Sequence, residues 1–239
     1  FSVTLYAQNV TVSSGKTLTI ERSGSITIGG DFSNSGTVTL NSDSNEFAVI
    51  KVSGTTTGNI TYNRWVNEVG SGDWDLIGSP VDGLSISGFA TTNTAGTDVL
   101  ATNGSGQYAI GVYDNSVASG DADEWINYTN SGSGWQAGNF VKGKGYAMAS
   151  VSGGTGLLAF TGTVDTDATE TIAIEDYTDG SGTVWNLIAN PYPSFITIGP
   201  NSTTDTFLEV NDHVIDDTYV GVYGYDADNS DGELYDIYN

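Results

Sequence analysis

The stretch VTVSSGKTLTIERSGSITIGGDFSNSGTVTL, residues 10–40, alternates apolar residues with threonine and serine in short runs. In a strand, such alternation places the apolar side chains on one face and the hydroxyl side chains on the other. Clusters of Ser, Asn and Gly separate the runs, and Gly supplies the positive φ that tight turns require. Helical periodicity is nearly absent, so the stretch predicts an all-β fold. The predicted strands are Val10–Val12, Leu18–Ile20, Ile26–Ile28 and Val38–Leu40.

The spacing of these strands fits either a meander of hairpins or the short rungs of a β-solenoid. We prefer the solenoid. A solenoid rung cannot bury its own apolar face, so a short stack needs a cap at both ends. The domain that follows would cap one end. The other end carries Phe1–Tyr6, an apolar alternating strand whose uncovered edge invites pairing with another chain, through Phe1, Val3 and Leu5.

The chain also contains a long internal repeat. Trp74–Pro80 (WDLIGSP) returns as Trp185–Pro191 (WNLIANP), and Tyr108 has a counterpart in Tyr219. A nearly constant offset between matching residues over such a long stretch is not expected by chance. The second copy is shorter, because nothing in it answers residues 129–156. The strands of both copies are short and separated by Asn, Asp and Gly, as in antiparallel β-sandwiches.

These patterns predict three parts. Residues 1–45 would form the solenoid or meander, residues 46–156 a first β-sandwich repeat, and residues 157–239 a second, incomplete one. Within each motif, Trp and Leu are two residues apart and would fill the core. The proline that ends each motif blocks further ladder bonding.

The repeated motif, Trp-[Asn/Asp]-Leu-Ile-[Gly/Ala]-[Asn/Ser]-Pro, with Tyr192-Pro193-Ser194 after the second copy, resembles a domain of secreted surface proteins of Bacteroidota. These proteins are typically exported by the type IX secretion system. The Thr/Ser/Gly strands before the motif and the Gly-Lys-Gly-Tyr run at 143–146 resemble its usual surroundings. The resemblance implies export, a β-sandwich and membership of large adhesive or polymer-handling surface proteins. It implies no catalytic residues.

Composition excludes several functions. The chain of 239 residues has 6 Lys and Arg against 29 Asp and Glu, a net charge of −23, so nucleic-acid phosphates and anionic membrane surfaces would repel it. No apolar run is long enough to insert into a membrane. Without cysteine it has no disulfide and no thiolate chemistry. Thirty-two Gly and few Lys are typical of an extracellular or cell-surface β protein.

Catalysis has little support in the sequence. His213 is the single histidine, and it stands in an ordinary loop-to-strand junction without a Gly-x-Ser-x-Gly nucleophile motif elsewhere. Two carboxylates would suffice for a glycosidase, but no pattern selects a pair among the many acids. We therefore expect no enzyme and no catalytic residue.

The strongest chemical signal is an acidic loop at the same place in both copies. Alternating Asp and Asn on a Gly-containing turn can bring several oxygens onto one hard cation, and calcium would be the natural occupant. An ordinary solvated hairpin loop rich in turn-forming residues would have the same composition. The candidate ligands are Asp226, Asp228, Asp231 and Glu233 in the second copy, with Asp121 and Asp123 as a second candidate site.

Two functions from different classes follow. The first is a non-enzymatic extracellular structural or adhesive subunit that self-associates into a filament, head to tail, by strand exchange. The alternative is a polysaccharide-binding module of a larger secreted enzyme. Trp135 would then contact the sugar, because it lies in a polar loop and not in an alternating strand.

Overall fold

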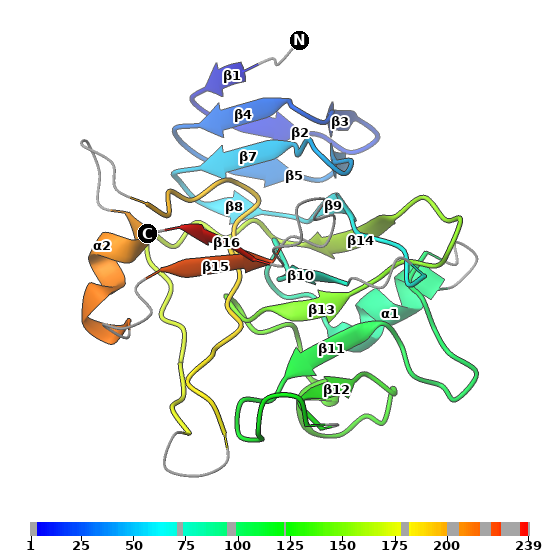
Figure 1. Ribbon diagram of the computed structural model, residues 1–239. Coiled ribbons are helices and arrows are strands. Elements are labelled where there is room, and N and C mark those ends of the chain that lie inside the picture. The colour runs from blue at the N-terminus through cyan, green and yellow to red at the C-terminus, as the bar shows by residue number, and fades with distance from the viewer. Residues whose placement is uncertain are drawn as a thin grey trace. The chain divides into compact units, whose positions relative to one another are not determined.

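The computed structural model describes residues 4–70, 74–94, 99–121, 123–177, 182–199, 206–215, 221–225 and 235–238. These residues form an all-β protein in which short strands predominate (Figure 1). The contacts divide the chain into two compact units, Phe1–Ser194 and Phe195–Asn239.

The N-terminal strands form a parallel β-solenoid. In each of its sheets, a strand pairs in parallel with a strand of the next coil, whereas a meander would pair consecutive strands antiparallel. The preference for a solenoid is therefore confirmed. The first sheet contains β1 (Thr4–Ala7), β4 (Ser25–Ile28) and β7 (Val49–Val52); the second contains β2 (Val10–Val12), β5 (Phe32–Asn34) and β8 (Thr56–Thr57); the third contains β3 (Thr17–Ile20), β6 (Thr37–Asn41) and β9 (Ile60–Trp65).

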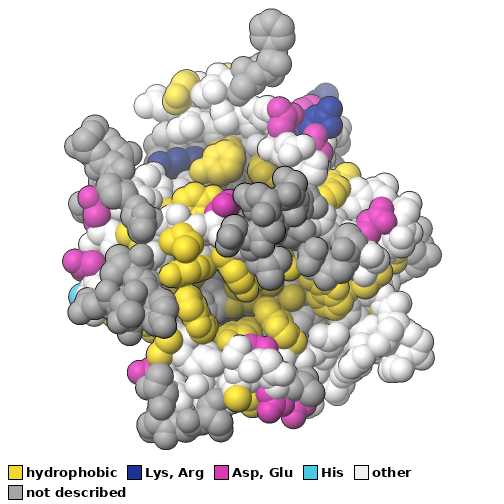
Figure 2. All heavy atoms as spheres, viewed as in Figure 1, with side chains coloured by type: hydrophobic (Ala, Val, Ile, Leu, Met, Phe, Trp, Pro, Cys, Tyr) yellow, Lys and Arg dark blue, Asp and Glu magenta, His cyan; other side chains and the backbone are white. Residues whose placement is uncertain are grey.

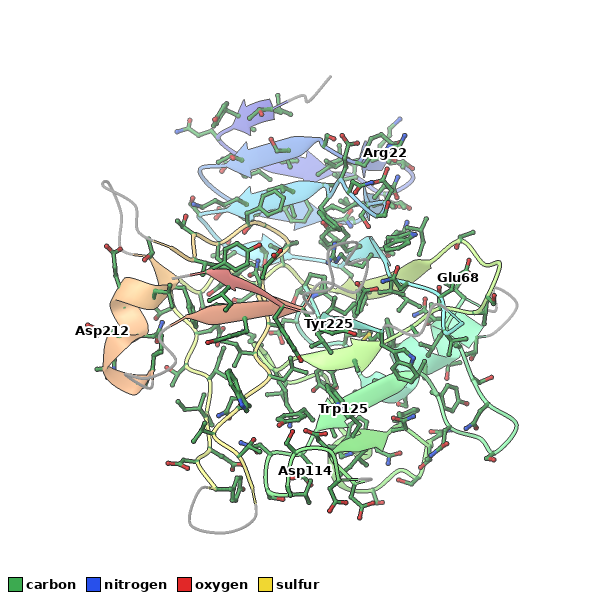
Figure 3. The ribbon with its side chains drawn as sticks, viewed as in Figure 1. Arg22, Glu68, Asp114, Trp125, Asp212 and Tyr225 are labelled. Atoms are coloured by element: carbon green, nitrogen blue, oxygen red, sulfur yellow. The ribbon has the colours of Figure 1, made fainter. Side chains whose placement is uncertain are left out.

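The interior of the solenoid is built from the apolar half of each alternating strand. Ile28, Leu40 and Ile50 are buried, and Phe32 fills the wide step between two of the predicted strands. The strand β5, which contains Phe32, was missed in the sequence because its other two residues, Ser33 and Asn34, are polar. Outside, Arg22 on the turn between β3 and β4 pairs with Asp43 at 2.6 Å (Figure 3).

A separate antiparallel sheet follows the three solenoid sheets, with the strand order β10-β13-β11-β12. The 3-10 helix η1 (Gly134–Ala137) precedes β13 in the chain. The strands of this sheet are β10 (Asp75–Ile77), β11 (Ile110–Tyr113), β12 (Trp125–Asn127) and β13 (Tyr146–Met148). Sheets of this kind agree with the predicted sandwich-like architecture.

The helix α1 (Ile86–Thr94) was not expected from the sequence. It buries Ile86, Phe89 and Asn93, which are spaced as on one face of a helix. Phe89 packs on Phe160 with ring centroids 4.5 Å apart. The Asn93 side chain accepts from the Ala159 N–H at 2.7 Å and so ties the helix to the strand β14 (Leu157–Gly162).

The predicted boundary at residues 156 and 157 falls at the start of β14. This strand pairs antiparallel with β9 of the solenoid along its whole length, from Leu157 opposite Trp65 to Gly162 opposite Ile60. Leu158 and Phe160 point into the common core and are fully buried. The compact unit accordingly continues past β14 to Ser194.

The two copies of the repeated motif lie against one segment, residues 143–148. In the first copy, Asp75–Ile77 pairs with Tyr146–Met148. In the second copy, the Gly145 N–H donates to the Leu187 carbonyl at 3.0 Å, and the Ala189 N–H donates to the Gly143 carbonyl at 2.8 Å. Both motifs therefore pair with the same segment of the chain.

The unit Phe195–Asn239 contains α2 (Phe207–Asn211), the 3-10 helix η2 (Asp212–Val214) and a hairpin of β15 (Val222–Tyr225) and β16 (Tyr235–Tyr238). Thr206 and Glu209 form a reciprocal capping box at the start of α2, which explains where that short helix begins.

Candidate functional site

The first rung of the solenoid has an unpaired edge. Within the described part of the chain, β1 pairs with β4 alone, β2 with β5 alone and β3 with β6 alone. The inward-facing column shows the consequence: Leu5 is 52% exposed, whereas its neighbours Ile26 and Ile50 are 3% and 1% exposed. Among the described residues, Leu5 thus occupies an interior position of the solenoid that no further strand covers.

The opposite end of the solenoid is capped by the same chain. The strand β14 covers the edge of β9, the Ile50 N–H of β7 donates to the Pro193 carbonyl at 2.9 Å, and the Thr56 hydroxyl of β8 donates to the Val164 carbonyl at 2.8 Å. All three sheets are therefore closed at this end, but by residues that were predicted to belong to the second repeat (157–239) and not by the domain that directly follows the solenoid, which was the expected cap. Of the predicted assembly residues, Leu5 lies in the open rung, while Phe1 and Val3 lie outside the described residues.

The hairpin of the second unit has a similar open edge. Among the residues that the structure describes, β16 pairs only with β15. The apolar side chains of β16 are largely in solvent, with Tyr235 48% and Ile237 55% exposed. An isolated pair of strands is marginal in water, so a further strand would stabilise it.

The predicted calcium ligands are placed only in part. Asp226, Asp228, Asp231 and Glu233 lie outside the described residues. Asp121 and Asp123 lie in the loop between β11 and β12, the hairpin where Asp114 and Trp125 are labelled in Figure 3. There the Asp121 carboxylate accepts from the Asp123 N–H at 3.2 Å, and the Asp121 carbonyl accepts from the Glu124 N–H at 3.1 Å.

A different acidic cluster, not singled out in the sequence, surrounds Lys142. The carboxylate oxygens of Asp165, Asp167 and Glu170 lie within 4.8 Å of one another. The Lys142 ammonium lies 2.9 Å from both the Asp165 and the Glu170 carboxylates and 3.7 Å from that of Asp82. A lysine thus supplies the positive charge at the place where these acids converge. Asp165, Asp167 and Glu170 lie within six residues of one another, but their contact with Lys142 and Asp82, far away in the chain, gave no signal in the sequence.

The electrostatics of this cluster favour its charged state. Burial opposes the charge on Lys142, but the hydrogen bonds with Asp165 and Glu170 outweigh it and raise the lysine pKa above its ordinary value. Burial likewise opposes the ionisation of Asp165, whose side chain is 5% exposed. The Asp167 N–H and Lys142 outweigh that effect and hold the pKa of Asp165 below its usual range.

Trp135 and His213 occupy different settings. Trp135 lies in η1, is half-buried against the core, and packs near Tyr128 and Tyr146 with ring centroids 6.0 and 6.4 Å away. Its environment is that of a packing residue, which disfavours a sugar platform there. The His213 side chain is 71% exposed and lies 3.8 Å from the Asp212 carboxylate.

The tryptophans of the repeated motif differ from each other. Trp74 packs against the core, as predicted, whereas the same prediction is wrong for Trp185, which is 43% exposed. Trp74 leads directly into β10 of the antiparallel sheet, while the backbone hydrogen bonds between the second motif and residues 143–145 involve Leu187 and Ala189. Position in the sheet, and not the motif itself, sets how deeply each ring is buried.

The fold defines an all-β protein that joins a short parallel solenoid to an antiparallel sheet. The chain belongs to the family described as "Domain of unknown function (DUF8693)", whose model matches residues 2–236. No curated protein and no solved structure matches it. Among the described residues, no helix is long and apolar enough to cross a membrane.

Proposed function

We propose that the protein is a non-enzymatic, extracellular structural or adhesive subunit that assembles head to tail by strand addition. The open first rung carries this proposal, because Leu5 sits in a column whose other members are almost completely buried. A further rung would bury Leu5 and pair the free edges of β1, β2 and β3. Burying a leucine side chain stabilises by about 1.5–3 kcal/mol.

The strand β16 is the proposed donor. It offers an unpaired edge among the described residues and exposed apolar side chains, which are the two features that strand addition uses. Because donor and acceptor are different surfaces, the contact is heterologous and continues from subunit to subunit. The second motif needs no strand from a neighbour, since residues 143–145 already pair with it.

The setting outside the cell rests on the resemblance of the repeated motif and on the composition, rich in Gly and poor in Lys. Calcium in the loop with Asp226 and Asp228 stays a prediction from the sequence. The polysaccharide-binding alternative has less support, because Trp135, its proposed sugar contact, is half-buried and packs near Tyr128 and Tyr146.

Replacing Leu5 tests the proposal. Leu5→Asp places a charge inside the contact, so we expect assembly to be lost while the monomer stays folded, because Leu5 is already half exposed. Tyr6→Asp is the matched control: Tyr6 is 77% exposed and pairs with Thr27 on the outer face. Electron microscopy of negatively stained particles and sedimentation would measure the filaments. A wild-type chain that remains monomeric at every concentration would refute the proposal.

A further inference from the structure

The outer face of the third solenoid sheet carries threonines in register. Thr19 pairs with Thr39, Thr39 with Thr61, and Thr61 with Thr161, which makes one row across β3, β6, β9 and β14. A second, parallel row begins with Thr17 and Thr37. We call these six residues the threonine array: Thr17, Thr19, Thr37, Thr39, Thr61 and Thr161.

Strand geometry sets a regular lattice for the array. Neighbouring strands lie about 4.8 Å apart, and residues two apart on one strand lie about 6.7 Å apart. The strands are held from behind by a tightly buried interior, with Leu40 and Phe160 at 0% exposure and Val38 at 2%. Threonine is also restricted at χ1 because it branches at Cβ. The hydroxyl and methyl groups are therefore repeated at fixed intervals on a firm backbone.

The hydroxyls of the array are available to an external ligand. Thr61 and Thr161 share one hydrogen bond of 2.9 Å. For Thr17, Thr19, Thr37 and Thr39, the described part of the chain provides no side-chain hydrogen bond. Thr17, Thr19 and Thr37 are exposed, and Thr39 in the middle is half-buried. Each hydroxyl can both donate and accept.

The chemistry of the array selects the kind of ligand. None of its positions is charged, although the chain has a net charge of −23, so it does not recognise an ion or a polyelectrolyte. None is aromatic, so it offers no ring on which a sugar could stack. What it offers is a periodic, uncharged set of donors, acceptors and methyl groups. Crystalline water is an uncharged ligand that repeats hydrogen-bonding groups at atomic intervals and needs no aromatic platform. We propose that the threonine array binds the surface of ice.

The test uses the full chain and measures thermal hysteresis, inhibition of ice recrystallisation, and uptake of fluorescently labelled protein into a growing ice crystal. We expect the wild-type protein to shape ice and to enter it. Thr39→Tyr places a bulky ring in the middle of the four-residue row, so this variant should lose most of these activities. Thermal unfolding followed by circular dichroism would check that the variant is folded.

The matched control is Thr27→Tyr. Thr27 lies in β4, the middle strand of another solenoid sheet, on the outer face between Tyr6 and Lys51, and this variant should keep the wild-type activity. If Thr39→Tyr does not fold, Thr39→Val removes the hydroxyl, keeps the branched shape and should weaken ice binding.

Three results would overturn the proposal. The first is exclusion of the folded wild-type protein from ice. The second is equal activity of Thr39→Tyr and Thr27→Tyr. The third is binding of the array to crystalline cellulose or chitin, through Thr39, without binding to ice. None of these results bears on assembly through Leu5.

Discussion

At the scale of single residues, Lys142 is a single positive charge that several carboxylates of this acidic chain share. Lys142 contacts carboxylates from the segment before α1 and from the segment after β14, namely Asp82, Asp165, Asp167 and Glu170. Asp165 is nearly buried, so its charge depends on this partner. Removing the lysine leaves several carboxylates without a positive partner. The free-energy cost of these unpaired charges is larger than the net stabilisation that the ion pairs provide.

We therefore predict that Lys142→Met destabilises the protein by about 2 kcal/mol at neutral pH. Urea unfolding would measure the loss. Lys144→Met is the control, since no carboxylate of the described chain lies within ion-pair distance of Lys144. An equal loss in both variants would contradict the role of the cluster.

The loss should depend on pH. Because the pKa of Asp165 is lowered in the folded state, its contribution is present above the ordinary pKa of about 3.9 and is lost as the pH falls through the folded value. In Lys142→Met the carboxylates repel one another, and protonation relieves this repulsion. The difference in unfolding free energy between wild type and variant should therefore shrink as the pH falls toward 4.

At the scale of elements, the segment 143–148 holds both copies of the repeated motif. Corresponding residues of the two copies meet there: a Cβ placed on Gly78 would lie 2.6 Å from the Cβ of Ala189 and 3.0 Å from the Lys144 carbonyl oxygen. Glycine at 78 is therefore required by close approach. The repeat predicted two related motifs, but it did not predict that they would pack against each other.

This contact predicts a coupled pair of substitutions. Gly78→Ala should destabilise the protein by about 1–3 kcal/mol through overpacking. Adding Ala189→Gly transfers the methyl group from one copy to the other, so the double variant should recover about 1 kcal/mol relative to the sum of the single changes. A double-mutant cycle by urea unfolding measures this coupling. Additive changes in the unfolding free energy would show that the residues at 78 and 189 are not in tight contact.

At the scale of the whole molecule, self-repulsion dominates the electrostatics. Six basic residues face 29 acidic ones, and acidic side chains appear at several places on the face shown in Figure 2. Surface charges of one sign destabilise a compact state, and salt screens them. The same repulsion opposes contact between subunits, so assembly should also be favoured by salt.

We predict that the unfolding temperature rises when NaCl is increased from about 0.01 to about 0.15 M, because the Debye length falls from about 30 to about 8 Å. Differential scanning calorimetry would measure the change. An uncharged solute at the same osmolality serves as the control. A flat or falling unfolding temperature would mean that attractive ion pairs, such as Arg22 with Asp43, outweigh the repulsion.

The sequence by itself determined the alternating strands of the solenoid, β1 to β4 and β6, because a period of two is a local property that each strand carries in its own residues. It also determined the duplicated motif, and it predicted the acidic loops as ion sites and the N-terminal strand as an edge. One local signal was overlooked, the helical spacing of Ile86, Phe89 and Asn93 in α1.

Only the tertiary structure decided which strands are neighbours. The pairing of β14 with β9, the docking of Leu187 on Gly145, the convergence of four carboxylates on Lys142 and the threonine array all join residues far apart in the chain. Such contacts depend on how whole strands stack to bury their apolar faces, and no short window of sequence contains that information.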